Sequence, residues 1–186
     1  MKKAFKAFSI FLLSSLLYTG VSAQEKTVMV GGAAMYPNKN IVENAVNSKD
    51  HTTLVAAVKA AGLVETLSGA GPFTVFAPTN AAFDKLPKGT VETLVKPENK
   101  ATLTTVLTYH VVPGRIDSKT LMNLIKENGG KYSAKTVQGG NLTFTSKGNV
   151  IMITDEKGGM SHVTIKDVYQ SNGIIHVVDT VVMPNS

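Results

Sequence analysis

The sequence has no cysteine and no tryptophan among its 186 residues, and it has a single arginine, Arg115. The absence of cysteine excludes disulfide bonds, thiol catalysis and thiolate metal sites. One arginine is poor material for recognising phosphate groups, because the planar guanidinium is the side chain that pairs with them through two hydrogen bonds. The fold must therefore be held together by its hydrophobic core.

The chain also lacks an apolar run long enough to span a membrane. Three lysines within the first six residues precede an apolar stretch over residues 7–17, and Val21-Ser22-Ala23 follows. A bilayer requires roughly 20 apolar residues, so this layout is typical of a signal peptide. We predict a signal peptide over residues 1–23, and an exported chain that is secreted or periplasmic and is not inserted in a membrane after cleavage.

Part of the net positive charge of the chain lies in this leader. Its three lysines account for half of the formal net charge of +6, and the other lysines are interspersed with acidic residues along the sequence. Nucleic-acid-binding proteins need a basic patch that neutralises phosphates. We therefore expect no nucleic-acid partner.

Length and composition predict one domain after the leader. A chain of this size with 43% hydrophobic residues can bury roughly two thirds of its unfolded surface without disulfides or metals. Residues 24–39 contain Gly31-Gly32 and Pro37 and show little periodicity, which predicts a flexible lead-in. The domain itself is expected over residues 40–184.

The hydrophobic period changes along the domain. Apolar residues recur at helical spacing up to about residue 125, with Gly62 as a predicted helix end. Beyond Lys131 they alternate with polar residues, and turn-forming residues interrupt the alternation at 146–149 and 171–173. Helices first and strands later predict an α+β fold with an antiparallel sheet.

Three segments resemble the fasciclin-like domain family. They are TVFAPTNAAFDKLP at residues 74–87, LTYHVVPGRI at 107–116 and NGIIHVVDTVVMP at 172–184. Their order and spacing are similar to the first conserved block, the central Tyr-His motif and the second conserved block of that family. The resemblance covers residues 40–184. It implies a wedge-shaped antiparallel β-sandwich flanked by several short helices, in exported proteins involved in adhesion and matrix contacts.

The first of these segments turns from a strand into a helix. Pro78 has no N–H to donate to a strand ladder and is expected to end the strand, while Thr79 or Asn80 is expected to cap the helix that follows. Phe83 and Leu86 then hold this helix against the core. The alternative is that this joint borders a ligand groove.

Tyr109 and His110 are the candidate partner-binding residues. The resemblance implies integrin or matrix contacts through a Tyr-His region, but the Asp-Ile pair also associated with integrin contact is absent, because the chain has Asp179-Thr180 there. The flanking Leu107 and Val111 favour a second interpretation, in which His110 is a buried and hydrogen-bonded ring. Both interpretations stay open.

No spacing of residues predicts catalysis or metal binding. The four histidines, at positions 51, 110, 162 and 176, have no metal-ligand spacing, and neither a G-x-S-x-G nor an S-x-x-K motif occurs. His176 alternates with Ile175 and Val177, which predicts a structural role on a strand. We assign no catalytic, cofactor-binding or metal-binding residue, and we expect a protein that is not an enzyme and needs no cofactor.

Two functional hypotheses follow. The first is a monomeric, exported, non-enzymatic adhesion or interaction module, whose partner is a protein or glycan of the cell surface or extracellular matrix, for example in a biofilm. The alternative, implied by pigment binding in proteins that resemble this family, is a carrier of a small apolar ligand such as a carotenoid. Phe76, Phe83 and Met160 would line the groove that such a carrier needs.

Overall fold

The structure is a computed structural model that describes residues 27–185. The predicted signal peptide over residues 1–23 lies outside the described residues and stays a prediction. Between residues 27 and 185, no helix has the length and apolar character to cross a membrane.

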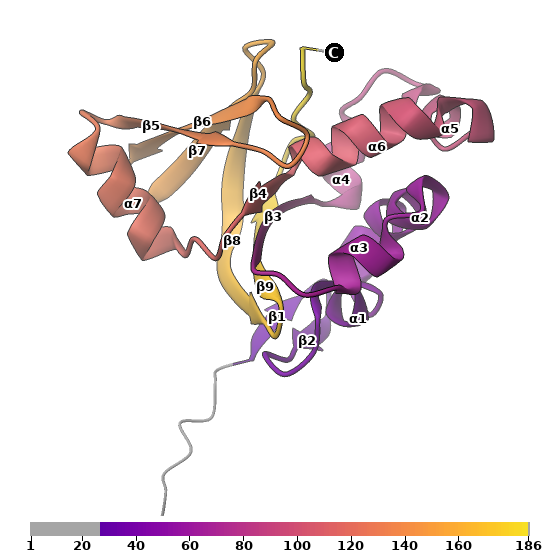
Figure 1. Ribbon diagram of the computed structural model, residues 1–186, viewed down its shortest axis with the longest axis horizontal. Coiled ribbons are helices and arrows are strands. Elements are labelled where there is room, and N and C mark those ends of the chain that lie inside the picture. The colour runs from indigo at the N-terminus through magenta and orange to yellow at the C-terminus, as the bar shows by residue number, and fades with distance from the viewer. Residues whose placement is uncertain (1–26, 186) are drawn as a thin grey trace, which may run out of the picture.

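Short helices and strands alternate in the first part of the chain, and strands dominate the second (Figure 1). The helices are α1 (Ile41–Ala45), α2 (Thr52–Ala61), α3 (Val64–Ser68), α4 (Asn80–Asp84), α5 (Thr90–Leu94), α6 (Lys100–Tyr109) and α7 (Ser118–Glu127), with the 3-10 helices η1 (Lys49–His51) and η2 (Pro97–Asn99). The strands are β1 (Val28–Val30), β2 (Ala33–Met35), β3 (Phe73–Pro78), β4 (Val111–Pro113), β5 (Lys131–Lys135), β6 (Asn141–Lys147), β7 (Val150–Thr154), β8 (Met160–Gln170) and β9 (Gly173–Val178).

Local sequence signals explain where several helices begin and end. Asn40 caps α1 through a capping box with Glu43, and Asp117 caps α7 by accepting a hydrogen bond from the Thr120 amide. Gly62 adopts the left-handed conformation that ends α2, as the sequence predicts.

Strands β3 to β9 form one seven-stranded sheet in the order β4-β3-β9-β8-β7-β6-β5. Neighbouring strands are antiparallel, except that β3 and β9 run parallel, with Phe73 opposite Gly173. Strand β8 pairs with β7 through residues 160–162 and with β9 from Val163 onward. Within the pairing with β9 the register shifts twice, between Val163 and Ile165 and between Ile165 and Val168, and Asp167 has a φ of 61°, so β8 is irregular and bends there. The α+β class and the wedge-shaped sandwich are confirmed, and the parallel pair adds to the antiparallel sheet that the sequence predicts.

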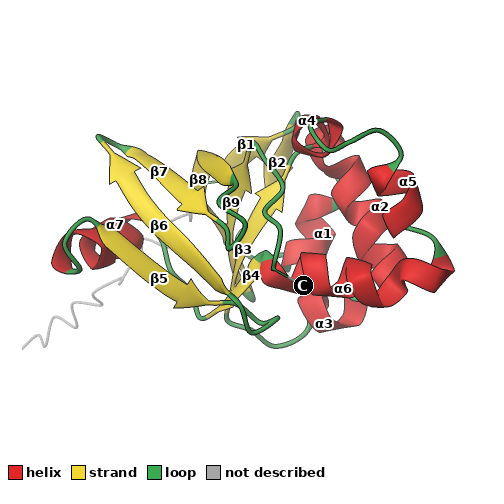
Figure 2. Ribbon diagram, turned by 90° about the horizontal axis from the view of Figure 1, so that it is seen from above, coloured by secondary structure: helices red, strands yellow, loops and turns green. Residues whose placement is uncertain are grey.

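Two hydrophobic cores lie on the two faces of β3. Val75 and Ala77 pack against the helices that cover one face of the sheet, α1 to α6, which lie together on one side of the molecule (Figure 2). Phe76 points the other way, into a second core with Leu142 and Phe144 of β6, and its ring centroid lies 5.2 Å from that of Phe144. Burial on both faces explains why β3 reads as a continuous apolar run.

The flexible lead-in predicted for residues 24–39 is wrong for the part that the structure describes. Strands β1 and β2 form a hairpin, in which Val30 pairs with Ala33 and both Gly31 and Gly32 have positive φ. Positive φ at both central residues is characteristic of the type I′ turn, one of the two favoured two-residue hairpin turns. Val30 and Met35 are buried in the core beneath the helices, which holds the hairpin in place.

Candidate functional site

The joint between β3 and α4 is an architectural element. The Thr79 hydroxyl accepts a hydrogen bond from the Ala82 amide at 3.2 Å, so Thr79 is the N-cap of α4. Pro78 is the last residue of β3 and lies opposite Val178, and Phe83 is buried in the helix-side core. These positions agree with the interpretation of the joint as a strand end and helix start.

Asn80 has a different role from the predicted cap of its own helix. Its side-chain oxygen accepts a hydrogen bond from the Thr53 amide at 3.0 Å, and its side-chain nitrogen donates to the carbonyl of Lys49 at 2.9 Å and to the hydroxyl of Thr52 at 3.0 Å. Asn80 therefore satisfies a free N–H at the start of α2 from another part of the chain. The joint connects α4 to α2 and presents no free polar group of Asn80 to a ligand.

Tyr109 lies inside the molecule, with none of its surface exposed. Its hydroxyl donates to the carbonyl of Asn141 at 2.7 Å and accepts from the amide of Glu156 at 3.2 Å. Burial raises the pKa of Tyr109 to about 12, since the ionised phenol is the form that loses solvation. The side chain connects the end of α6 to β6 and to the turn between β7 and β8.

His110 is 2% exposed. Its Nδ1 lies 2.8 Å from the carbonyl oxygen of Val106, and its Nε2 lies 3.2 Å from the backbone nitrogen of Val182. Because the Val182 N–H is the donor, Nε2 carries no proton and Nδ1–H donates to Val106. Burial lowers the pKa of His110 to about 4, against the opposing effects of the Val106 carbonyl and the charge of Asp155.

The segment after β9 is held by side chains in place of a strand ladder. Val182 donates to His110, Met183 donates to the carboxylate of Asp155 at 2.9 Å, and Asn185 donates to that of Glu156 at 3.3 Å. Sequence reasoning missed this set of contacts. One of these contacts had a local signal in the run Asp155 to Gly159. An aspartate shortly before two glycines is typical of a turn in which the carboxylate binds nearby amides. Asp155 accepts a hydrogen bond from the Gly159 amide at 2.7 Å.

A serine, an aspartate and a histidine meet where β8 bends, but their hydrogen bonds exclude the arrangement of a catalytic triad. Ser118 donates from its hydroxyl and from its amide to the carboxylate of Asp167, and not to a histidine. His176 is fully buried, with Nε2 2.9 Å from the Ile116 carbonyl oxygen and Nδ1 accepting from the Asp167 amide at 3.3 Å. Both ring nitrogens are therefore engaged by the backbone and neither is free to act as a base.

His162 is the partly exposed histidine of the four. Its Nδ1 lies 3.2 Å from the Asp179 carboxylate, which also pairs with Lys85 at 3.7 Å. Burial acts to raise the pKa of Asp179, but hydrogen bonds from His162 and Thr180 and the charge of Lys85 together lower it below its ordinary value. Throughout residues 27–185, no group of three or more histidine, aspartate or glutamate side chains is arranged to hold a metal ion.

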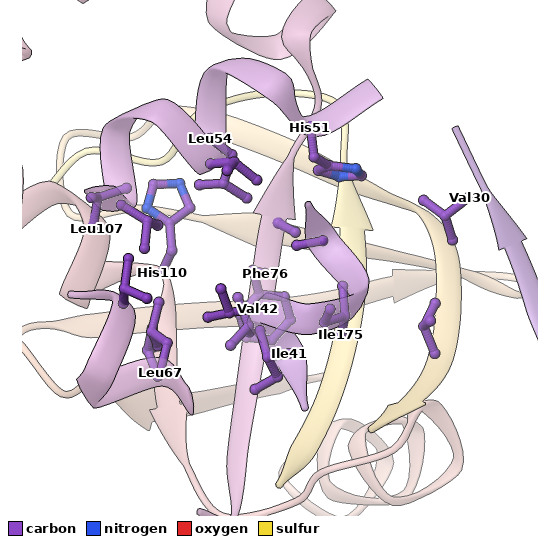
Figure 3. A pocket seen from close by; sticks show the side chains of 18 of the residues that line it. Val30, Ile41, Val42, His51, Leu54, Leu67, Phe76, Leu107, His110 and Ile175 are labelled. Carbon is purple, nitrogen blue, oxygen red and sulfur yellow. The ribbon is translucent and has the colours of Figure 1, made fainter. Parts of the chain in front are cut away.

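An apolar cavity of about 50 Å³ lies between the helices and the sheet, and Figure 3 shows His51 and His110 on different sides of it. His51 is 3% exposed, and its Nδ1 lies 2.9 Å from the Ser48 hydroxyl. Its Nε2 is buried without a hydrogen-bond partner among the described residues, although the Ala77 carbonyl is near the ring. Burial lowers the pKa of His51 and favours the neutral ring.

The structure does not form the groove predicted from three apolar side chains. Phe76 borders the cavity from β3, although its ring packs against Phe144 in the second core. Phe83 packs elsewhere in the helix-side core, and Met160 is 60% exposed at the start of β8. The cavity is also far smaller than the roughly 300–1,000 Å³ of pockets that take drug-sized ligands. The alternative role as a carotenoid carrier has no support in the described part of the chain.

A family model described as Fasciclin domain matches residues 49–184. The chain belongs to the fasciclin domain family. It is 43% identical to Protein sll1483 of Synechocystis sp., over 97% of this chain and 94% of that protein. It is 33% identical to the Cell surface glycolipoprotein MPB83 of Mycobacterium bovis, over 83% of this chain and 64% of that protein.

The fold of this fasciclin domain is also similar to a solved structure, that of a FAS1 domain pair from the insect cell adhesion molecule Fasciclin I. The TM-score is 0.71 at 18% sequence identity, and the match covers 79% of this chain and 51% of that chain. At this identity the likeness shows the fold alone.

Proposed function

We propose that this fasciclin domain is an exported, non-enzymatic interaction module that binds a protein or polysaccharide at the cell surface or in the extracellular matrix. The observation that carries this proposal is that the side chains that could take part in catalysis are instead engaged in contacts inside the fold. Tyr109, His110, Ser118 and His176 are buried and hydrogen-bonded to other parts of the domain. The contact with a partner is then made by the outer surface of the domain, without a cofactor.

The names of two similar proteins support the same proposal. One is a cell surface glycolipoprotein and the other is a cell adhesion molecule. The predicted leader adds an export route, since the working chain would begin at Gln24 after cleavage. The exported domain is proposed to be a monomer in a secreted or periplasmic location.

Binding of the exported chain, residues 24–186, to intact cells, envelope fractions and extracellular polysaccharide of the source organism tests the proposal. Saturable binding to one of these fractions, lost when the domain is heat-denatured, is the expected result. No saturable binding to any of them would overturn the interaction role. N-terminal sequencing of the exported protein tests the leader separately, and an intact Met1 would contradict cleavage after Ala23.

A further inference from the structure

Positive charge is unevenly distributed over the fold. Residues 118–154, which include α7, β5, β6 and β7, contain five lysines and one acidic residue, Glu127. Of the acids that flank this stretch, Asp155 is 8% exposed and accepts bonds from backbone amides. Asp117 is partly exposed and accepts from the Thr120 amide as the cap of α7. Most lysines of the domain lie elsewhere, among acidic residues, so this part of the fold is distinguished by its small number of carboxylates.

Strand register places three of these lysines on one face of the sheet. Lys131 lies opposite Thr145, Lys135 lies opposite Asn141, and Lys147 lies opposite Val150. The pairing continues across β6, β7 and β8. Thr143 is paired with Thr154, Thr154 with Met160, and Met152 with His162. Side chains on alternate positions point to the same face of a strand. The outward-facing residues of this face are Lys131, Ser133, Lys135, Asn141, Thr143, Thr145, Lys147, Val150, Met152, Thr154, Met160 and His162.

This face, which we call the basic sheet face, carries no carboxylate among those outward-facing residues. Two carboxylates lie at its margin. Asp179 is engaged by His162 and Lys85, and the exposed Glu156 accepts hydrogen bonds from the backbone amides of Asn141 and Asn185. All three lysines of the face are exposed, whereas Leu142 and Phe144, which alternate with the outward-facing residues of β6, are buried in the second core. The three lysine side chains of the face are therefore accessible to a ligand.

No described helix covers the basic sheet face. Viewed from above, β5, β6 and β7 lie in front with nothing drawn over them (Figure 2), and α7 lies on their other side (Figure 1). The buried side chains of α7, Leu121 and Ile125, contact the opposite face of these strands through the second core. The sheet presents a broad, open surface and not a cleft.

The composition of the face selects among anionic partners. Tight protein interfaces are enriched in aromatic residues, methionine and arginine and depleted in lysine and serine. The face has Met152 and Met160, but it has no phenylalanine, tyrosine, tryptophan or arginine and it carries three lysines. Nucleic-acid surfaces use arginine and stacking aromatic residues, and the face has neither. Lysines set among threonine hydroxyls and the Asn141 amide suit a hydrated polymer that carries carboxylates and hydroxyl groups.

We propose that the basic sheet face binds an acidic polysaccharide. This inference rests on the proposed interaction role and assigns its surface and ligand class. Lys131, Lys135 and Lys147 pair with carboxylates along the polymer, and the threonine, serine and asparagine side chains exchange hydrogen bonds with its hydroxyl groups. Individual contacts are weak because they are exposed, so the affinity comes from several of them made at once and falls with salt.

Binding of the exported chain to immobilised polygalacturonate and to neutral dextran tests this proposal. We expect retention on polygalacturonate only, lost when the ionic strength rises from about 0.05 M to about 0.5 M. The triple variant Lys131→Glu, Lys135→Glu and Lys147→Glu should bind about tenfold or more weakly, because three exposed ion pairs are replaced by repulsion.

A matched triple variant on the helical side separates local contacts from net charge. Lys49→Glu, Lys88→Glu and Lys96→Glu change three exposed lysines by the same total charge, and this variant should keep its affinity within about twofold, since distant surface charges are screened. Both variants should unfold at the same denaturant concentration as the wild-type domain.

Three results would overturn the proposal. They are equal weakening by both triple variants, equal retention on dextran, and binding to duplex DNA or anionic phospholipid vesicles but not to polygalacturonate. The interaction role itself fails only if the wild-type domain also binds no fraction of the source cells or matrix.

Discussion

The Nε2 atom of His110 accepts a hydrogen bond from the backbone N–H of Val182, which lies 72 residues further along the chain. This contact joins the end of α6 to the segment that follows β9. Since Nδ1 of the same ring is held by the Val106 carbonyl, one imidazole spans two segments that no strand ladder connects. The histidine of the Tyr-His motif thus has a structural function that requires it to be buried and neutral.

Replacing this ring should destabilise the fold. His110→Ala leaves a cavity and removes the acceptor of the Val182 N–H, so we expect a loss of roughly 2–4 kcal/mol in the free energy of unfolding, measured by urea denaturation. His162→Ala is the control, because His162 is partly exposed and its ion pair contributes no more than about 1 kcal/mol. A His110→Ala domain with wild-type stability that no longer binds its partner would show instead that the ring is a contact residue.

Acid should destabilise the domain through its buried histidines. The folded-state pKa of His110 is lowered to about 4 from 6.5, so the unfolded chain binds the proton more tightly. The neutral His110 ring therefore contributes about 3 kcal/mol to the free energy of unfolding. This contribution is fully present above pH 6.5 and is lost as the pH falls from 6.5 through 4. The pKa values of His51 and His176 are lowered by burial as well, so they act in the same direction.

Urea denaturation at several pH values between 4 and 7 measures this effect. Asp117 and Asp179 have pKa values lowered from 3.8, so their contribution is lost mainly below this range. His110→Ala should show a shallower dependence on pH than the wild-type domain. Equal slopes for the two proteins would contradict the assignment to His110.

Tyr109→Phe tests the other half of the motif. The change keeps the ring and removes a hydroxyl that bonds to Asn141 and Glu156, so we expect a loss of roughly 1–2 kcal/mol at pH 7. The raised pKa of Tyr109, about 12, means that its contribution is present below pH 10 and is lost as the pH rises through 12. The variant should lack this alkaline loss, and an unchanged alkaline profile would place the effect elsewhere.

Local signals predicted much of the fold. The glycine that ends α2 and the period-two pattern of β6 are properties of a few adjacent residues, and both are confirmed. The hairpin over residues 28–35 was missed because strands of three residues are too short to show a period, and two glycines are as typical of a flexible segment as of a tight turn.

Contacts between distant segments could not be predicted in the same way. Nothing near Val182 indicates that a histidine 72 residues earlier accepts its N–H. The basic sheet face also depends on contacts between segments. Lys131 and Lys147 become neighbours only when β5 and β6 pair in this register. A shift of one residue would turn one of these strands over and separate its lysines from the others.

The joint at residues 79 and 80 allows two kinds of cap to be compared. Thr79→Ala removes the N-cap of α4 and should lower the free energy of unfolding by roughly 0.5–2 kcal/mol. Asn80→Ala removes three hydrogen bonds, one of them to the free Thr53 N–H at the start of α2, so we expect the larger loss, roughly 1–3 kcal/mol. Urea denaturation of both variants measures the difference.

Partner binding by the folded fraction of each variant should stay at the wild-type level, because Thr79 and Asn80 face other parts of the domain. Asn80→Asp keeps the oxygen that accepts from Thr53 but loses the donor to the Lys49 carbonyl, so its stability should lie between those of the wild type and Asn80→Ala. A variant of either residue that unfolds like the wild type but loses its partner would identify the joint as a binding site, since a cap cannot be removed without cost in stability.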